Sequence, residues 1–146
     1  MITLQDVKNN KEIEAFIKSG QKQLDALGYT KHSTRHINIV SKRAGDLLEV
    51  LGYPKERIEL ARIAGYMHDI GNCINRIDHA HSGAILAYEV LKNMDMPAEH
   101  RSITKENTWN AVFCKSFGKA FPPKIRPSVS ANASEFVMLR ENAASV

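Results

Sequence analysis

The sequence contains few cysteines and no long apolar run. Cys73 and Cys114 are the only cysteines in 146 residues, too few and too far apart for a disulfide framework or a cysteine metal motif. No uncharged apolar stretch approaches the roughly 20 residues that a membrane-spanning helix needs. The first residues, MITLQDVKNNKEIE, lack the basic start and apolar core of a secretory signal. We therefore expect a cytoplasmic protein with free thiols and no membrane partner.

The sequence also lacks a strong excess of one charge. Residues 1–97 hold 13 Lys and Arg against 12 Asp and Glu, and residues 98–146 hold 7 against 4. The formal net charge of +4 is therefore the sum of +1 and +3, and most of it comes from the second part. Because the basic residues are scattered along the chain, the sequence argues against a nucleic-acid-binding surface.

Apolar side chains recur at helical spacing through the first two-thirds of the chain, without strand-like alternation. The pattern predicts helices over 11–27, over 34–51, from Pro54 to about residue 70, and over 82–94. Gly28 and Gly52 follow the first two helices as stops. We expect an all-α fold, a helical bundle. The predicted inward faces are Ile13, Phe16, Ile17, Leu24 and Leu27; Ile37, Val40, Ala44, Leu47, Leu48 and Leu51; Ile58, Ala61, Ala64 and Met67; and Ile85, Leu86, Val90 and Leu91.

The sequence changes character after Pro97. Residues 98–146 show no sustained helical period, apart from a candidate helix near 103–114, and the stretch PPKIRPSVSANAS is typical of a loop or tail. The prediction is one domain over residues 1–146, with a helical core over 1–97 and an atypical C-terminal segment over 98–146.

Histidine and aspartate supply the clearest chemical signal. His68 and Asp69 are adjacent at the end of an apolar helix, just before Gly71, and His36 lies one helix earlier on the edge of an apolar face. Imidazole nitrogen with carboxylate oxygen suits Zn, Fe, Mn or Co. The alternative is structural: Asp69 hydrogen-bonded to an imidazole at a helix end, and His36 satisfied within the core.

Three stretches, taken in order, resemble the HD superfamily of metal-dependent phosphohydrolases, and small bacterial HD-domain proteins within it. They are TKHSTRH (30–36), GYPKERIELARIAGYMHDIGN (52–72) and NRIDHAHSGAILAYEVL (75–91), and the resemblance covers about residues 1–97. It implies an all-α bundle around a divalent ion (Mn, Fe, Zn, Ni, Co or Mg) with His36, His68 and Asp69 as ligands. In two-metal members, the position of His79 helps to hold the second ion.

Two departures from the family pattern stand out. Asn72 occupies a position where some HD enzymes carry a phosphate-binding Lys. The pattern also closes with an Asp on a late helix, whereas this chain has no Asp beyond Pro97 and only one His there, His100. A changed reading frame near Ala98 and a genuinely divergent tail both account for the missing ligand.

The resemblance implies hydrolysis of a phosphate ester, with a nucleotide as the favoured substrate, by metal-activated water. His68 and Asp69 are the predicted catalytic residues, and Arg35, Asn72 and Arg76 the predicted contacts to substrate phosphate. The alternative is a catalytically impaired HD-domain protein that serves as a nucleotide-binding or protein-interaction module. The sequence leaves the oligomeric state open, a homo-oligomer included.

Overall fold

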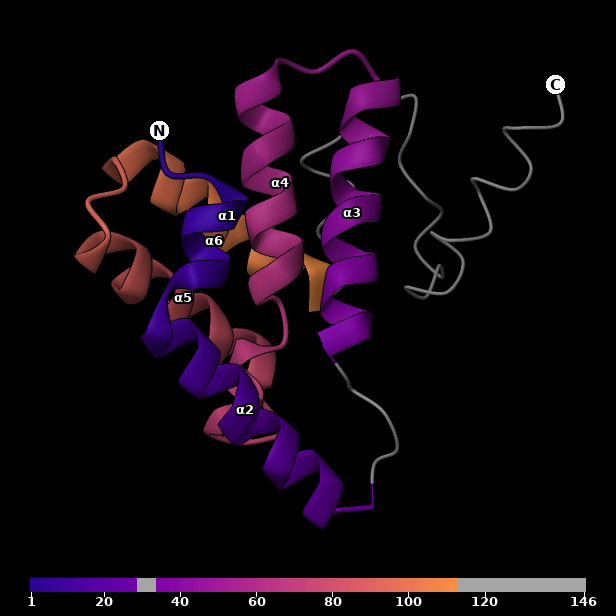
Figure 1. The fold of residues 1–146 in the computed structure, drawn as a ribbon, viewed down its shortest axis with the longest axis vertical. Coiled ribbons are helices and arrows are strands. Elements are labelled where there is room, and N and C mark those ends of the chain that lie inside the picture. The colour runs from indigo at the N-terminus through magenta and orange to yellow at the C-terminus, as the bar shows by residue number, and fades with distance from the viewer. Residues whose placement is uncertain (29–33, 113–146) are drawn as a thin grey trace, which may run out of the picture.

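The described part of the protein is built from helices alone. The computed structural model describes residues 1–28 and 34–112 (Figure 1); the predicted tail beyond residue 112, with Cys114, lies outside them. Within the described residues there is no strand, which confirms the all-α prediction, and every helix is too short or too polar to cross a bilayer. The elements are α1 (Leu4–Asn9), α2 (Lys11–Ala26), α3 (Thr34–Val50), α4 (Lys55–Met67), the 3₁₀ helix η1 (Ile70–Cys73), α5 (His79–Asn93) and α6 (Ala98–Val112).

Helices α3 and α4 form an antiparallel pair, visible side by side in Figure 1. They approach closely because a side chain is missing at the crossing: a Cβ on Gly65 would lie 2.9 Å from the Cα of Ser41. The Ser41 hydroxyl donates a hydrogen bond to the Arg62 carbonyl at 2.8 Å, across the same contact. This crossing fixes where the start of α3 lies relative to the end of α4.

The buried line of α3 differs from the predicted one. Ile37 is buried as predicted, but the next buried positions are the small residues Ser41 and Gly45. Sequence reasoning favoured large apolar side chains, which instead lie half-buried on either side of the crossing: Val40, Ala44, Leu47, Leu48 and Leu51. The predicted glycine stop is confirmed. Gly52 has a φ of +73° and ends the helix. The Gly52 N–H donates a hydrogen bond to the Glu49 carbonyl, and the Tyr53 N–H donates one to the Leu48 carbonyl.

Helix α4 lies at the centre of the core. All four predicted inward residues are buried: Ile58, Ala61, Ala64 and Met67. Leu60, Ile63 and Tyr66 are buried as well, because α1, α3 and α6 all pack against this helix. Each fully buried large aliphatic side chain contributes about 1.5–3 kcal/mol, so the end of α4 is anchored firmly.

A short first helix precedes the predicted one. Thr3 and Asp6 form a capping box at the start of α1, and Val7 is fully buried. Asn10 then ends α1 and caps α2 with its side chain, which accepts from Glu12 and Ile13. The Thr-x-x-Asp spacing was the available sequence signal for α1.

The last two described helices begin earlier than predicted. α5 starts at His79, and its buried face consists largely of small residues, while Ile85, predicted to face inward, is 55% exposed. α6 starts at Ala98 and packs against α4 and α5. Among the α6 side chains that the structure describes, Thr104 and Thr108 are fully buried, and Ile103 packs partly buried against the core. Polar residues thus occupy inward positions of α6, where the sequence shows no sustained apolar period.

Candidate metal centre

Three side chains from separate points of the sequence converge where α3 begins and α4 ends. The His36 Nε2 lies 3.2 Å from the His68 Nε2, and the Asp69 Oδ2 lies 3.1 Å from His68 and 3.7 Å from His36. One ligand atom from each residue falls within 4.8 Å of the others. The group therefore brings two imidazole nitrogens and a carboxylate oxygen to one place, a donor set that suits a transition metal.

Local backbone geometry lets the adjacent His68 and Asp69 reach the same point. α4 ends at Met67, His68 still has helical dihedral angles, and Asp69 leaves the helix with φ −99° and ψ 5°. This sparsely allowed region often holds active-site residues. Without the change of direction, successive side chains of a helix would point about 100° apart.

His68 is held in one orientation by the backbone. Its Nδ1 lies 2.8 Å from the carbonyl oxygen of Gly65. A carbonyl only accepts, so Nδ1 carries the proton and the lone pair of neutral His68 lies on Nε2, toward His36 and Asp69. Metal-binding histidines are commonly oriented in this way. The side chain is 7% exposed, so the orientation is also sterically confined.

His79 approaches the same carboxylate from the other side. Its Nδ1 lies 2.8 Å from the carbonyl oxygen of Arg76, and its Nε2 lies 3.6 Å from the Oδ1 of Asp69. Asp69 thus directs Oδ2 toward the His36–His68 pair and Oδ1 toward His79. His79 is not one of the three clustered residues, but it faces the same carboxylate.

Close backbone contact brings His79 to this position. Gly71 of η1 packs directly on the start of α5, where an added Cβ would lie 2.5 Å from the Gly83 nitrogen and still closer to the His79 carbonyl. On the opposite side, an added Cβ on Gly20 of α2 would lie 3.2 Å from both Asn72 and Cys73. Gly20, which interrupts the predicted helical pattern, is therefore the point where α2 rests on η1.

Burial and charge act against each other at these residues. Burial opposes protonation of His68, but the hydrogen bond to Asp69 and the Asp69 charge outweigh it and raise the His68 pKa. Burial likewise opposes ionisation of Asp69, yet the surrounding histidines hold its pKa well below the usual range. Burial lowers the pKa of His79. Asp69 is therefore ionised at neutral pH, as a metal ligand must be.

The three predicted phosphate contacts occupy different environments. Asn72 is buried; its amide donates to the Asp69 carbonyl at 2.9 Å, and its oxygen accepts from the Arg76 NH1 at 3.2 Å. That NH1 lies 3.5 Å from the His79 Nε2. Arg35 is exposed on the first turn of α3, and the structure does not bring it into this group of contacts.

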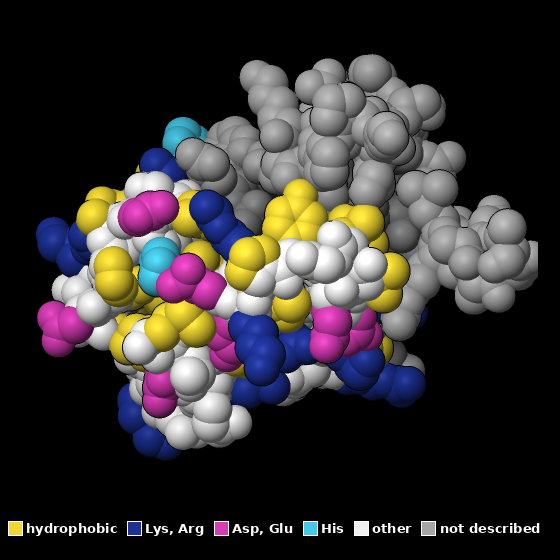
Figure 2. Space-filling model, turned by 90° about the horizontal axis from the view of Figure 1, so that it is seen from above, with side chains coloured by type: hydrophobic (Ala, Val, Ile, Leu, Met, Phe, Trp, Pro, Cys, Tyr) yellow, Lys and Arg dark blue, Asp and Glu magenta, His cyan; other side chains and the backbone are white. Residues whose placement is uncertain are grey.

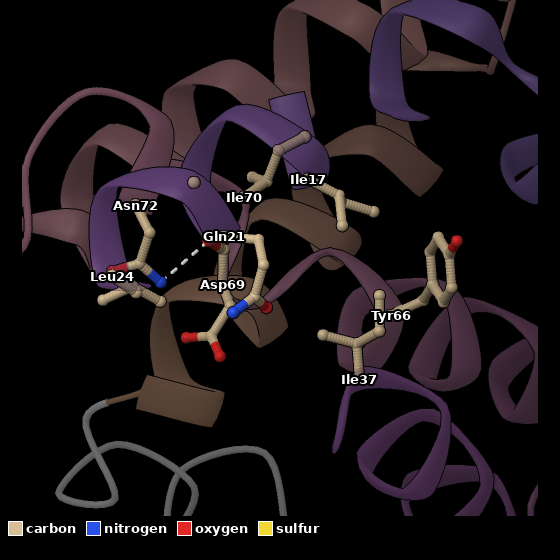
Figure 3. A pocket seen from close by; sticks show the side chains of 9 residues that line it. Ile17, Gln21, Leu24, Ile37, Tyr66, Asp69, Ile70 and Asn72 are labelled. Atoms are coloured by element: carbon tan, nitrogen blue, oxygen red, sulfur yellow. Dashed lines mark hydrogen bonds between the residues drawn. The ribbon is translucent and has the colours of Figure 1, made fainter. Parts of the chain in front are cut away.

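A hollow opens beside Asp69, between α2 and the ends of α3 and α4 (Figure 3). Its lining includes the apolar side chains Ile17, Leu24, Ile37 and Tyr66. Gln21 and Asp69 add an amide and a carboxylate to this wall. Sequence reasoning missed Gln21, because a glutamine on the polar side of a predicted helix carries no chemical signal by itself.

The other described histidines lie apart from the cluster. His81 is exposed beside Asp78, with 3.4 Å between the His81 Nδ1 and the Asp78 Oδ2, and His100 lies 3.2 Å from Glu56. His32 lies outside the described residues. Cys73 is half-buried, and burial raises the pKa of its thiol, so no reactive thiolate is indicated at the turn.

Comparison with known proteins supports one family. The model of the family "HD domain" matches residues 30–122. The chain is also 31% identical over 101 residues to the uncharacterized protein MJ1020 of Methanocaldococcus jannaschii. That match covers 58% of this chain and 39% of the relative, so this chain spans about two-fifths of the relative's length. No solved structure matches the chain.

The matched range differs from the resemblance seen in the sequence, which covered about residues 1–97. It begins after α2 and continues past Pro97 through α6. α6 therefore belongs to the shared part of the fold, although its apolar pattern is weak. His36, His68, Asp69 and His79 all lie within the match. Because the match covers more than half of the chain, the protein belongs to the HD domain family, a family of metal-dependent phosphohydrolases.

Proposed function

We propose that the protein hydrolyses a phosphate ester, with a nucleotide as the favoured substrate, using a divalent ion held by His36, His68 and Asp69. One observation carries the proposal: the ligand atoms converge, with the His68 lone pair fixed toward them by the Gly65 carbonyl. Two close imidazole nitrogens beside an ionised carboxylate form a set that a cation stabilises. The imidazole content favours Mn, Fe, Zn, Ni or Co over Mg.

The ion would supply a water of lowered pKa and positive charge next to the phosphoryl oxygens. Residues of the chain would orient the attacking water and bind the phosphate. Asp69 stays ionised, so its Oδ1 can accept a hydrogen bond from the attacking water while Oδ2 serves as a ligand. Arg76, positioned by Asn72, presents a guanidinium whose forked N–H groups match phosphate oxygens. Arg35, at the exposed start of α3, would contact an outer phosphate.

The hollow beside Asp69 is narrow, because its apolar lining side chains Leu24, Ile37 and Tyr66 are themselves buried. It has room for a water-sized group next to Asp69 and not for a base ring. The preference for a nucleotide therefore rests on the family resemblance, and the hydrolysis screen below decides it.

A metal-content measurement followed by a hydrolysis screen tests the proposal. Purified protein should retain a divalent metal, and with that metal added it should cleave a nucleoside monophosphate or a generic phosphodiester. His68→Ala and Asp69→Ala should lose both properties. His81→Ala, a histidine on the exposed side of α5, is the matched control and should keep them. Metal-free protein after incubation with each candidate ion would contradict the proposal.

The alternative function, an impaired member that binds nucleotides or proteins, is favoured by one observation. The clustered group of the described residues has three ligands, and the chain contains no Asp beyond Pro97 to close it. In that case a nucleotide should bind with measurable heat in calorimetry, while the metal-loaded protein releases no phosphate.

A further inference from the structure

The Asp69 carboxylate has two sides with different neighbours. Oδ2 lies against His36 and His68, at 3.7 and 3.1 Å, whereas Oδ1 lies 3.6 Å from the Nε2 of His79. A carboxylate with histidine nitrogens near each oxygen has the arrangement that bridges two cations. The Oδ1 side, with His79, is therefore the place where a second ion would bind.

The Arg76 guanidinium, a positive charge of the protein itself, already lies on the Oδ1 side. The Arg76 NH1 lies 3.5 Å from the His79 Nε2. The Nδ1 of His79 is committed to the Arg76 carbonyl, so neutral His79 has its lone pair on Nε2, the nitrogen nearest this guanidinium. Asn72 holds the same NH1 from the other side at 3.2 Å, and its own amide is fixed by the Asp69 carbonyl. All four residues lie within one short segment, 69–79.

We infer that Arg76 takes the place of a second metal ion, so that this chain binds one ion and uses the guanidinium as its second positive charge. The inference rests on the proposed function, since the single ion is the one held by His36, His68 and Asp69. Three effects support it. The Arg76 charge repels a divalent ion at short range, its NH1 competes for the His79 nitrogen, and its other N–H groups can bind a phosphoryl oxygen directly.

The inference narrows the substrate class. A phosphoryl group between the ion and Arg76 would be neutralised from both sides, as in a two-metal site, without a second ion. The substrate is then a phosphate ester with at least two unsubstituted phosphoryl oxygens, one for each cation. A phosphate monoester has about three such oxygens and a phosphodiester about two, so both classes meet the condition and a triester does not.

Manganese binding by the whole chain tests the inference. We would titrate Mn²⁺ into the wild-type protein, Arg76→Met, Arg76→Lys and the matched surface control Arg57→Met. Bound metal would be counted by elemental analysis and its state read by electron paramagnetic resonance. Wild type, Arg76→Lys and Arg57→Met should each bind one Mn²⁺ with the spectrum of an isolated ion. Arg76→Met should bind a second, at least about ten-fold tighter than any second site of the wild type, with a spin-coupled spectrum.

His79 provides the companion variants. Under the inference His79 is not a ligand in the wild type, so His79→Ala should leave Mn²⁺ stoichiometry and affinity unchanged, whereas Arg76→Met with His79→Ala should return to one ion. Two coupled ions in the wild type would overturn the inference and leave the proposed function standing. So would a folded Arg76→Met with one ion, or weaker Mn²⁺ binding by His79→Ala. If no Mn²⁺ binds the wild type, the proposed function fails first and the inference with it.

Discussion

The two sides of the Asp69 carboxylate are built in different ways. On the Oδ2 side, His36 and His68 lie 32 positions apart in the sequence and meet only because α3 and α4 cross closely. On the Oδ1 side, Asn72, Arg76 and His79 lie within the short segment 72–79, which runs from η1 to the start of α5 and follows Asp69 closely. The first side depends on tertiary packing and the second on local backbone structure, so different substitutions should damage them.

A substitution at the α3–α4 crossing should disrupt the Oδ2 side without changing His36, His68 or Asp69. Gly65→Val would push a branched side chain into the backbone of Ser41, which leaves no room even for a Cβ. We expect a loss of about 3 kcal/mol or more in unfolding free energy, together with loss of metal binding, since His36 would move away from His68. Urea unfolding and a metal titration would measure the two effects.

The control for this substitution is Gly28→Ala, which changes a positive-φ glycine in open space at the end of α2. It should cost about 1 kcal/mol through backbone strain alone and leave metal affinity unchanged. A Gly65→Val protein that binds metal like the wild type would show that the crossing does not position His36.

The Oδ1 side should respond to a smaller change on α5. Gly83→Ala places a Cβ 3.1 Å from the Gly71 nitrogen, so α5 and His79 must shift by a few tenths of an ångström. We expect a cost of about 1 kcal/mol, unchanged affinity for the ion at His36 and His68, and a several-fold lower hydrolysis rate. Equal losses of affinity and rate would mean that the two sides are not separable.

Titration of His68 and His79 in the metal-free protein compares the electrostatic environments on the two sides of the Asp69 carboxylate. The His68 pKa is raised and the His79 pKa lowered from 6.5, so His68 should titrate above and His79 below that value in proton NMR. His68→Ala and His79→Ala would assign the signals, and the reverse order would contradict the expected environments.

The same shifts set the pH dependence of stability and binding. The contribution of protonated His68 to stability is complete below pH 6.5 and disappears as pH rises through its raised pKa. The contribution of neutral His79 is present above pH 6.5 and disappears as pH falls through its lowered pKa. Metal requires neutral His68, so metal affinity should increase across the window in which the His68 contribution disappears.

Sequence reasoning reached the three residues of the candidate metal site because their signal is local or strongly patterned. The His68–Asp69 doublet precedes a glycine at a helix end, and His36 lies on the edge of an apolar face. It could not reach contacts that depend on small residues, such as Ser41 on Gly65, because these carry no apolar period. Thr104 and Thr108 show the same limit: their burial follows from packing against α4 and α5, and their residue types predict exposure.

Charged side chains on the face shown in Figure 2 are less ordered than those around Asp69. On the face shown in Figure 2, acidic and basic side chains of the described residues are interspersed. The ordered charges are those around Asp69, where distances and orientations are fixed by backbone groups.

The position of α2 has a consequence for how the site is assembled. Ile17, Gln21 and Leu24 line the hollow beside Asp69, yet they lie outside residues 30–122, the part matched to the family. The same helix is held to the turn after Asp69 by a hydrogen bond that the Gln23 side chain donates to the Cys73 carbonyl at 2.6 Å, beside the close approach of Gly20. Substitutions on α2 can therefore change one wall of the hollow while His36, His68 and Asp69 stay as they are.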